Sequence, residues 1–547
     1  MTLLVPRTLA ATVVLGLTIN TSLYATDQWN IDCSHGKCAK AITSHLSDSS
    51  HMTKQRRALP EQLQHFFSAA TGWTAGSSVG LTSLIKKALA TVEKNRRQEQ
   101  IARAAVEFTP TKALGDSQSA TVKLAQTYKG LEVVGQEAMV HFDNEGTVAQ
   151  TTTNGTITAP LEVEPRLTTD QALRVLTDRY QQDVGLSNPA VLKVLQDFDG
   201  KARLVYHLLT RSTASHDGRE VYLDAHTGAV VIEFDRAYHA HAVEEVEEKS
   251  APQGGYRTVY SAATEAAQRP GRVDMGGYPT NINFAWYDKI IEDGAYNNEA
   301  LDRSAVNAYR NSGKVYDYFK DNFGRKSFDD KDTRIVSVVH MGVKMANAFW
   351  TSEFNVMGYG DGDGEGLVDL TYGLDVAAHE IAHGVTGSTA QLVYAAESGA
   401  LNEAFSDFFG KMVDFNENDW LIGGRIMAPK LKRRALRNME NPEEFGQPGS
   451  NDSELRKPTN VMCSRGNDNC GVHTNSGIPN RASVLVIQAI GKEKAEQLYY
   501  RVLTRHLSAT SNFATMRSET VKACGLMFGA DSEDCAQVDA AFAKVKM

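Results

Sequence analysis

Leu374-Asp-Val-Ala-Ala-His-Glu-Ile-Ala-His-Gly-Val385 is the stretch that decides which fold to expect of this 547-residue chain. Its apolar residues recur at steps of three and four, which predicts a helix, and they are Leu374, Ala378, Ile381 and Val385. On such a helix His379 and His383 lie one turn apart on the same face, where two imidazoles can bind one zinc ion. Glu380 would lie beside the metal without binding it, which is the place of a general base.

A third metal ligand is expected in the segment Gly399-Ala-Leu-Asn-Glu-Ala-Phe-Ser-Asp407. Glu403 follows His383 by 20 residues, which is enough chain for the first helix to end near Gly384 to Gly387 and for a second helix to return. Two histidines and one glutamate leave the fourth position of a tetrahedral zinc open, as in catalytic sites. Asp407, one turn after Glu403, can accept the second ring N–H of a zinc histidine. Taken singly, these residues could be a satisfied core histidine or a solvated acidic helix face, but their combination favours zinc.

Length and composition narrow the classes of function. At ~150 residues per domain the chain should form roughly three to four domains. Its 42% apolar and 22% charged residues are typical of a soluble globular protein. The net charge of -9, with a pI near 6.0, gives no reason to expect nucleic acid or an anionic membrane as a partner. An enzyme or a protein-binding module is therefore expected.

The first 25 residues have the pattern of an export signal. Arg7 is followed by an apolar run from Leu9 to Leu17 and then by small and polar residues up to Ala25. The run is too short to span a bilayer, and no other stretch approaches ~18 apolar residues, so a soluble secreted product is expected. A buried N-terminal helix is the alternative interpretation.

Six cysteines suit an oxidising compartment. Cys463 and Cys470 could close one tight loop, and Cys524 with Cys535 could close another, although sequence alone does not fix the pairing. For Cys33 and Cys38, a third short bridge and a free thiol pair are equally compatible with the spacing. None of the six has the CxxC spacing of a structural zinc site.

The chain divides into two unequal halves at an acidic joint that contains Pro and Gly, residues 239–255. Residues 51–115 are rich in Lys, Arg, Gln and Ala and are expected to be helical or loosely ordered. Residues 119–160 and 201–236 show short β-prone runs with turn signals. Between them, Thr168-Thr-Asp-Gln-Ala-Leu-Arg-Val-Leu176 starts like a capped helix. The first half is thus a small α+β region, and the second half becomes mainly helical.

These residues resemble the thermolysin family of metallopeptidases, and within it the secreted elastase-like and vibriolysin-like enzymes of Gram-negative bacteria. The resemblance covers nearly the whole chain and is carried by five segments in the family order. They are Asn347-Ala-Phe-Trp350, Tyr359-Gly-Asp-Gly-Asp-Gly364, His379-Glu-Ile-Ala-His383, Ser398-Gly-Ala-Leu-Asn-Glu-Ala-Phe-Ser-Asp-Phe-Phe-Gly410 and Gly471-Val-His-Thr-Asn-Ser-Gly477.

The resemblance implies a two-lobed α+β catalytic domain, preceded by an α+β propeptide that acts as chaperone and inhibitor. Residues 1–25 would be the signal peptide and 26–241 the propeptide. Residues 242–388 would form a β-rich N-terminal lobe that ends with the active-site helix, and 389–547 a mainly α-helical C-terminal lobe. His241-Ala242 resembles the junction at which some elastase-like relatives release their propeptide, so the enzyme is expected to process itself.

The resemblance also assigns roles to individual residues. Tyr394 and His473, the latter paired with Asp468, would hydrogen-bond the developing oxyanion, and Asn402 would support a zinc histidine. Asn347 and the backbone of Ala348 would hold the substrate as an added strand, and Arg437 would grip a substrate carbonyl. An apolar pocket for the residue after the scissile bond would be lined by Leu367, Val376 and Leu436. A core aromatic, a surface cation and a loop histidine are the ordinary alternatives for Tyr394, Arg437 and His473.

A calcium site near the active site is implied as well. Its ligands would be Asp375, Asp414, Asp419 and the backbone carbonyl of Leu421, all hard oxygen donors. Lys411 and Gly424 stand where some relatives have acidic ligands. One calcium ion rather than two is therefore expected.

A secreted zinc endopeptidase that cuts proteins and peptides is the function implied, with a preference for a hydrophobic residue after the scissile bond. Its own propeptide would inhibit it, the mature enzyme would be a monomer, and neither nucleic acid nor a membrane would be a partner. A zinc exopeptidase would need a group that captures a free amine. A non-catalytic binding protein would need a broken catalytic set. A peptide blocked at both ends, tested with and without a zinc chelator, separates the three.

Overall fold

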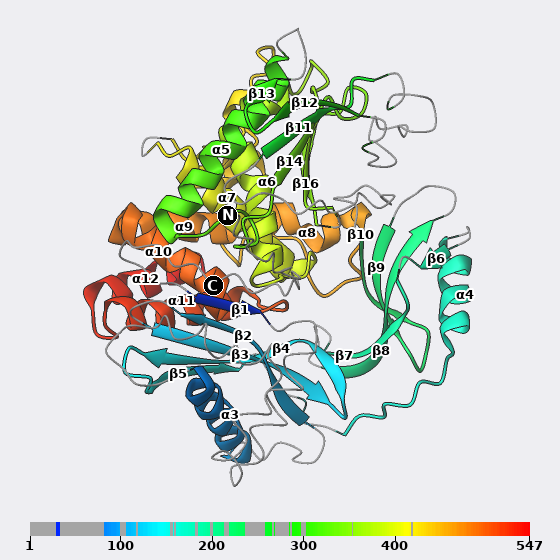
Figure 1. Ribbon diagram of the computed structural model, residues 1–547, viewed down its shortest axis with the longest axis vertical. Coiled ribbons are helices and arrows are strands. Elements are labelled where there is room, and N and C mark those ends of the chain that lie inside the picture. The colour runs from blue at the N-terminus through cyan, green and yellow to red at the C-terminus, as the bar shows by residue number, and fades with distance from the viewer. Residues whose placement is uncertain are drawn as a thin grey trace, which may run out of the picture. The chain divides into compact units, whose positions relative to one another are not determined.

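The computed structural model describes most of the chain from residue 81 onward (Figure 1). The described residues are 29–32, 81–98, 106–115, 119–153, 157, 160–180, 184–186, 188–196, 201–212, 218–235, 257–264, 267, 284, 287–296, 302–352, 354–416 and 419–547. The expected signal peptide, Cys33, Cys38 and the joint at 239–255 lie outside them. The chain forms two compact units, of which unit 1 comprises Met1–Thr91, Thr109–Leu124 and Val140–Gln150 and unit 2 the remainder.

Unit 1 contains a helix and parts of several strands. The strands β2 (Val106–Gly115), β3 (Ser119–Tyr128), β4 (Leu131–Asp143) and β5 (Val148–Thr153), and the helix α3 (Leu81–Gln98), each contribute residues to both units. Within unit 1, β1 (Trp29–Asp32) pairs antiparallel with β2 from Trp29 opposite Gly115 to Asp32 opposite Lys112. The expectation that residues 51–115 are helical or loosely ordered is therefore wrong for 106–115, where Val106, Phe108 and Thr109 favour a strand and Pro110 disfavours a helix.

The first part of unit 2 is a β-sheet with one helix against it. The strands are β6 (Val184–Leu186), β7 (Val191–Gln196), β8 (Ala202–Ser212), β9 (Gly218–Asp224) and β10 (Val230–Asp235), and β7 to β10 pair antiparallel in sequence order. The helix α4 (Thr169–Tyr180) buries Ala172 and Leu176 against Leu204 and Leu223 of this sheet. Its start is capped as expected, since Thr168 and Gln171 exchange side-chain to backbone hydrogen bonds of 2.8 and 3.3 Å.

A second sheet carries the edge on which the active site is built. Its strand order is β13-β12-β11-β14-β16-β15, with bounds β11 (Arg257–Ser261), β12 (Asp288–Glu292), β13 (Ala295–Tyr296), β14 (Ile335–Val339), β15 (Ala348–Thr351) and β16 (Val356–Tyr359). β11, β14 and β16 are parallel, whereas β15 is antiparallel to β16. The helix α5 (Arg303–Phe323) packs on the sheet, capped by Asp302 at its start and by Gly324 with a positive φ of 65° at its end.

The C-terminal part of unit 2 is helical, so the α+β class expected from the sequence is confirmed. The longer helices are α6 (Leu374–Ser388), α7 (Ala396–Val413), α8 (Asp468–Asn475), α9 (Gly477–Ile490), α10 (Lys492–Arg501), the π-helix η7 (Val502–His506), α11 (Phe513–Phe528) and α12 (Glu533–Lys544). Short elements lie between them: η3 (Leu370–Tyr372), β17 (Leu421–Ile422), η4 (Gly424–Ile426), β18 (Arg437–Asn438), η5 (Pro442–Phe445) and η6 (Arg465–Asn467). None of the helices in the described ranges is both long and apolar enough to cross a bilayer.

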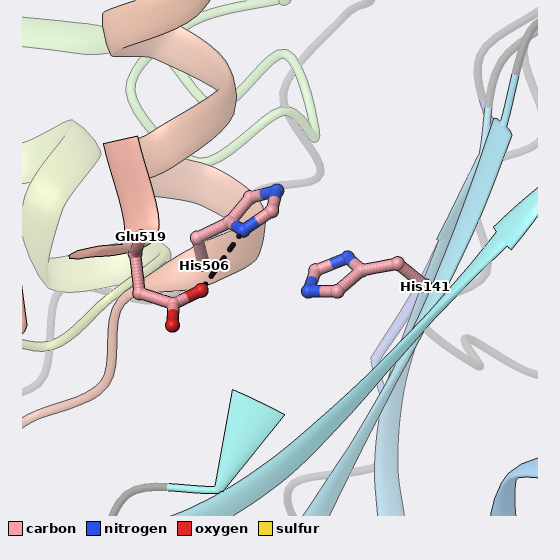
Figure 2. Close-up of side chains that lie close together, drawn as sticks. All are labelled: His141, His506 and Glu519. Carbon is pink, nitrogen blue, oxygen red and sulfur yellow. Dashed lines mark hydrogen bonds and ion pairs between the residues drawn. The ribbon is translucent and has the colours of Figure 1, made fainter. Parts of the chain in front are cut away.

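Buried polar groups also join the C-terminal helices. His506 at the end of η7 is completely buried and its Nδ1 lies 3.2 Å from Oε2 of Glu519 in α11 (Figure 2). Lys522 donates to the other oxygen of the same carboxylate at 2.7 Å. The buried Glu519 carboxylate is therefore stabilised by polar contacts with His506 of η7 and Lys522 of α11.

The helix α6 is buried on nearly all sides rather than on one stripe. It contacts β15 on one side and α7 on the other. Two glycines permit this close packing. A Cβ on Gly384 would lie 2.7 Å from the Trp350 ring, and a Cβ on Gly410 of α7 would lie 2.8 Å from the carbonyl oxygen of Asp375. The helix runs one residue beyond the expected end at Gly387, to Ser388.

We predict that Gly410→Ala lowers the free energy of unfolding by about 1–3 kcal/mol, because the added methyl group separates α7 from α6. Gly387→Ala is the matched control, since nothing lies within 4 Å of its Cβ position. There the substitution should be neutral or should stabilise by up to ~1 kcal/mol, as alanine favours the helix. Urea unfolding of both variants measures the difference, and equal stabilities would contradict the proposed close contact.

Candidate metal centre

Three side chains from α6 and α7 point their donor atoms at one place. Nε2 of His379 and Nε2 of His383 are 3.1 Å apart. The carboxylate of Glu403 puts Oε2 at 3.4 Å from the first nitrogen and Oε1 at 3.5 Å from the second. Atoms that each lie about 2.1 Å from a tetrahedral zinc ion are separated by roughly 3.4 Å, so the three side chains have the spacing of a zinc site.

A cation would stabilise the buried Glu403 carboxylate. The residue is completely buried, and its Oε2 has no hydrogen-bond partner among the described residues. A buried carboxylate oxygen without a partner is costly, and a metal ion at this place would satisfy it. The nitrogen and oxygen donors present are also those that zinc prefers. The residues therefore fit a zinc ion.

Both histidines are oriented through their second nitrogen. Nδ1 of His379 lies 2.8 Å from Oδ1 of Asp407, and Nδ1 of His383 lies 2.8 Å from Oδ1 of Asn402. Since carboxylate and amide oxygens accept hydrogen bonds, Nδ1 of each ring is the donor, and Nε2 is the nitrogen that faces the centre. Hydrogen bonding at the far side of each ring thus prepares the pair for metal binding.

Asp407 is the central anchor of this arrangement. Arg437 donates to both of its oxygens at 2.6 and 2.8 Å, and Asn480 donates a third hydrogen bond at 2.8 Å. Burial alone would raise the pKa of Asp407, but the guanidinium of Arg437 and the ring of His379 outweigh it and hold the pKa at about 2. The carboxylate is therefore charged throughout the physiological range.

Glu380 is positioned as a base beside the ligands. It is buried, and its Oε2 accepts the backbone N–H of Trp350 at 3.0 Å. Burial raises the pKa of Glu380 to about 7, and the nearby charge of Glu403 adds to the effect. A carboxyl group with a pKa near neutrality can both take up and return a proton at working pH.

Tyr394 and His473 lie on the other side of Glu403. The Tyr394 hydroxyl donates to Oε1 of Glu403 and lies 3.2 Å from Nε2 of His473, which is itself 3.6 Å from that oxygen. Nδ1 of His473 is 2.5 Å from Oδ1 of Asp468, so His473 presents Nε2 toward the centre. A hydroxyl and an imidazole nitrogen therefore lie close to the Glu403 carboxylate.

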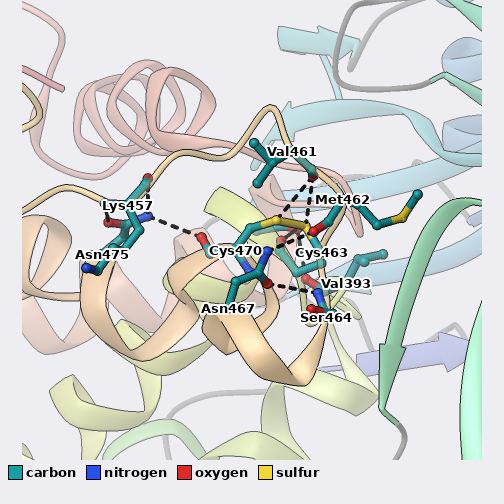
Figure 3. Close-up of a disulfide and its surroundings, with 11 residues drawn as sticks. Val393, Lys457, Val461, Met462, Cys463, Ser464, Asn467, Cys470 and Asn475 are labelled. Atoms are coloured by element: carbon teal, nitrogen blue, oxygen red, sulfur yellow. Dashed lines mark hydrogen bonds between the residues drawn. A yellow bond between two sulfur atoms is a disulfide. The ribbon is translucent and has the colours of Figure 1, made fainter.

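The loop that carries Asp468 is held in an unusual conformation by a disulfide. Asn469, Cys470 and Gly471 all have positive φ, at 47°, 69° and 79°. Cys470 is joined to Cys463, and the carbonyl oxygen of Val461 lies 3.4 Å from Sγ of Cys470 (Figure 3). Cys524 and Cys535 form the second disulfide. The two short pairings that the spacing suggested are the ones formed.

The residues expected to bind substrate lie around this centre. Ala348 is in β15, the edge strand of its sheet, and is paired with Tyr359 of β16. The carbonyl of the preceding residue, Asn347, accepts the N–H of Gly360 at 3.0 Å. Arg437 forms an ion pair with Asp407. The expected pocket residues share one core: Val376 is buried in it, and Leu367 and Leu436 are partly buried against it.

The expected calcium ligands line a polar cavity of about 680 Å³ together with three cationic residues, Lys411, Arg425 and Arg434. Asp414 Oδ1 is 3.0 Å from the Arg425 guanidinium, and Asp419 Oδ1 is 4.0 Å from the ammonium of Lys411, which is buried. Asp375 accepts the N–H of Gly423 at 2.6 Å. As arranged, this donor set does not fit calcium, because Arg425 and Lys411 lie beside two of its three carboxylates. The calcium ion expected from the sequence stays a prediction, and its binding requires Arg425 to leave Asp414.

Three functional contacts were not anticipated from the sequence. Asn480 bonds Asp407, Ser406 Oγ lies 3.1 Å from Nδ1 of His383, and Gln447 donates to the His473 carbonyl at 2.6 Å. Asn480 and Ser406 are completely buried polar residues in apolar helices. A buried amide or hydroxyl group needs a hydrogen-bond partner. A polar residue within an apolar helix is therefore the sequence feature that could have indicated these contacts.

Comparison with known proteins gives a consistent result. The model of "Thermolysin metallopeptidase, catalytic domain" matches residues 262–387, that of "Thermolysin metallopeptidase, alpha-helical domain" matches 390–547, and the "Fungalysin/Thermolysin Propeptide Motif" matches 107–153. The chain is 32% identical to bacillolysin of Brevibacillus brevis over 77% of its own length and 81% of the relative's. It is 35% identical to bacillolysin of Bacillus subtilis strain 168, covering 65% and 67%, and 33% identical to an extracellular elastase of Staphylococcus epidermidis, covering 72% and 78%.

We predict that Lys411→Glu creates a tight calcium site, because it removes a buried cation and adds a hard oxygen ligand to Asp375, Asp414 and Asp419. The variant should be less stable than wild type in calcium-free buffer, where four carboxylates repel one another. Millimolar calcium should raise its melting temperature by several degrees, and that of wild type by less.

Lys411→Gln is the control for this comparison, since it removes the charge without adding a carboxylate. Thermal unfolding with and without calcium measures all three proteins. A wild-type response as large as that of Lys411→Glu would show that Lys411 does not oppose the ion.

Proposed function

Because this chain belongs to the thermolysin family of metallopeptidases, we propose that His379, His383 and Glu403 hold the zinc ion with which it hydrolyses peptide bonds. The family membership makes the chain a zinc metalloendopeptidase that is produced as a proenzyme. One observation carries the assignment of the ligands: a buried Glu403 carboxylate without a partner at one oxygen faces two imidazoles whose far nitrogens are already bonded.

The residues divide the chemistry of hydrolysis among them. When bound, zinc polarises the scissile carbonyl and lowers the pKa of a water molecule. Glu380, with a pKa near 7, takes a proton from the attacking water and later returns it to the leaving amine. The Tyr394 hydroxyl and Nε2 of His473 donate hydrogen bonds to the developing oxyanion, and Asp468 keeps the His473 ring turned toward it.

Substrate would bind as an added strand along β15. The edge position of β15 supports this, since an edge strand presents backbone groups that a peptide can pair with. The N–H of Trp350 on the same strand holds Glu380, which ties the base to the substrate-binding edge. The shared apolar surroundings of Leu367, Val376 and Leu436 support a pocket for a hydrophobic residue after the scissile bond. Arg437 would contact a substrate carbonyl while remaining on Asp407.

The proposed organisation follows the family models. Residues 1–25 would be a signal peptide for secretion, 26–241 the propeptide, 242–388 the N-terminal lobe and 389–547 the C-terminal lobe. The matches at 107–153, 262–387 and 390–547 support this division. The propeptide would inhibit the enzyme until self-processing near His241-Ala242, and the mature enzyme would act as a secreted monomer.

We predict that His473→Ala folds and keeps its zinc but loses turnover by about two to three orders of magnitude, because the change removes a donor to the oxyanion and no ligand. Cleavage of a quenched peptide blocked at both ends gives the rate, with a chelator as the zinc control. Metal analysis of the purified variant decides its role, and a loss of zinc would assign His473 to the metal instead.

We predict that Glu380→Gln accumulates as an uncut precursor, because self-cleavage needs the same base as any other peptide bond. Gln is close in shape to Glu, so the zinc content should stay near that of wild type. N-terminal sequencing of wild type should find a start within roughly ten residues of Ala242. Normal processing of the purified variant, in the absence of other proteases, would rule out self-cleavage.

A further inference from the structure

We propose that two hydroxyls of the C-terminal lobe, from Ser508 and Thr510, clamp the backbone of Gly135 in the propeptide and set how long the cleaved propeptide stays bound. The proposal rests on the proposed function, in which residues up to about 241 are the propeptide. We call Gly135, Ser508 and Thr510 the hydroxyl clamp. All three belong to unit 2.

The clamp is a specific fit to one glycine. The Gly135 carbonyl accepts Ser508 Oγ at 3.0 Å and Thr510 Oγ1 at 3.1 Å. Gly135 has a positive φ of 67°, and a Cβ there would lie 2.3 Å from the Thr510 methyl carbon. Both the conformation and the space therefore exclude a side chain at this point of β4. A carbonyl that takes two hydroxyl donors has both of its lone pairs used, so the contact is saturated.

A second polar contact joins the same two parts of the chain. Thr152 in β5 donates to Oε2 of Glu519 at 2.7 Å. Glu519 is buried and is also bonded to Lys522 and His506 (Figure 2). Because Gly135 and Thr152 both lie within the matched propeptide motif, residues 107–153, that motif contacts the helical lobe at two polar points.

An apolar contact lies beside the proposed oxyanion residues. Side chains of β4 and of β7 to β10 form one core with Ala395, Ala396 and the Cys463–Cys470 bridge. Tyr394 is partly buried and packs against this core. The members are Val134 of β4, which pairs with β7, and Leu195, Val205, Tyr222, Ile232 and Phe234 of β7 to β10. Val134 is adjacent to Gly135, so the hydroxyl clamp fixes the strand that brings this core onto the catalytic loop.

After cleavage near Ala242, only such noncovalent contacts hold the propeptide in place. Removing either hydroxyl leaves one lone pair of the partly buried Gly135 carbonyl without its donor in the bound state, which weakens binding. The effect of an interface change falls mainly on the dissociation rate. Loss of one hydroxyl should therefore speed release of the propeptide by about tenfold, without changing the catalytic groups.

The test uses the full chain with Thr510→Val, which keeps the shape of the side chain and removes the hydroxyl. Ser518→Ala is the matched control, because Ser518 is an exposed hydroxyl residue on α11 next to Glu519. After self-processing, gel filtration over time measures how fast the propeptide leaves. Release should be about tenfold faster for Thr510→Val and unchanged for Ser518→Ala, and kcat of the freed enzymes should equal that of wild type.

A second arm separates this proposal from the proposed function. In the full chain carrying Glu380→Gln, a recognition sequence for an added protease replaces the residues around His241-Ala242, and the cut is made by that protease. Faster release with Thr510→Val in this catalytically silent chain supports the clamp whatever the peptidase assays show. Equal release rates for Thr510→Val and its parent, or a similar acceleration by Ser518→Ala, would overturn it.

Discussion

The catalytic half is organised around the burial of two negative charges on one helix. Glu403 and Asp407 in α7 are both completely removed from solvent, and an uncompensated carboxylate in that position would be prohibitively costly. Asp407 is satisfied by Arg437, Asn480 and a ring N–H. Glu403 receives the Tyr394 hydroxyl on one oxygen, and its other oxygen accepts no hydrogen bond from the part of the chain that the structure describes. This remaining deficit supports the proposed metal site, and the proposed zinc ligands, the anchor of their orientation and the proposed oxyanion donor are all grouped around it.

The convergence of those groups depends on how closely two helices approach. The contact of Gly410 with the Asp375 carbonyl brings α7 against α6, and the contact of Gly384 with Trp350 brings α6 against β15. The first contact allows donors on two helices to meet within 3.5 Å. The second allows the N–H of an edge strand to reach Glu380. Packing geometry thus sets the distance from the base to the metal and from the base to the substrate edge.

The helices α4 and α6 and the convergence of His379, His383 and Glu403 could be predicted because their determinants are local. The spacing of His379 and His383 on one helical face needs no knowledge of the fold, and the capped start at Thr168 is a property of four residues. Contacts between segments that are far apart in the sequence could be predicted less well. Residues 106–115 form a strand that pairs with β1. The expectation of a helix came from the Lys, Arg, Gln and Ala of the longer segment 51–115, although Val106, Phe108 and Pro110 locally favour a strand over a helix. Asn480 could not be assigned, since its partner Asp407 is 73 residues away. The cations at the expected calcium ligands depend likewise on three-dimensional placement.

The position of the propeptide contact bears on how the active site is completed. Tyr394 and the Cys463–Cys470 bridge lie on one core with the first sheet, and the bridge closes the loop of positive-φ residues that presents Asp468 to His473. Residues in that conformation cost free energy and persist only when their surroundings fix them. While the propeptide is bound, its apolar side chains supply part of those surroundings. Once it leaves, the disulfide and the hydrogen bonds of Asp468 to the backbone of His473 and Thr474 must hold the loop. The covalent bridge is therefore needed most in the mature enzyme, at the step when the surface that helped to form the loop is withdrawn.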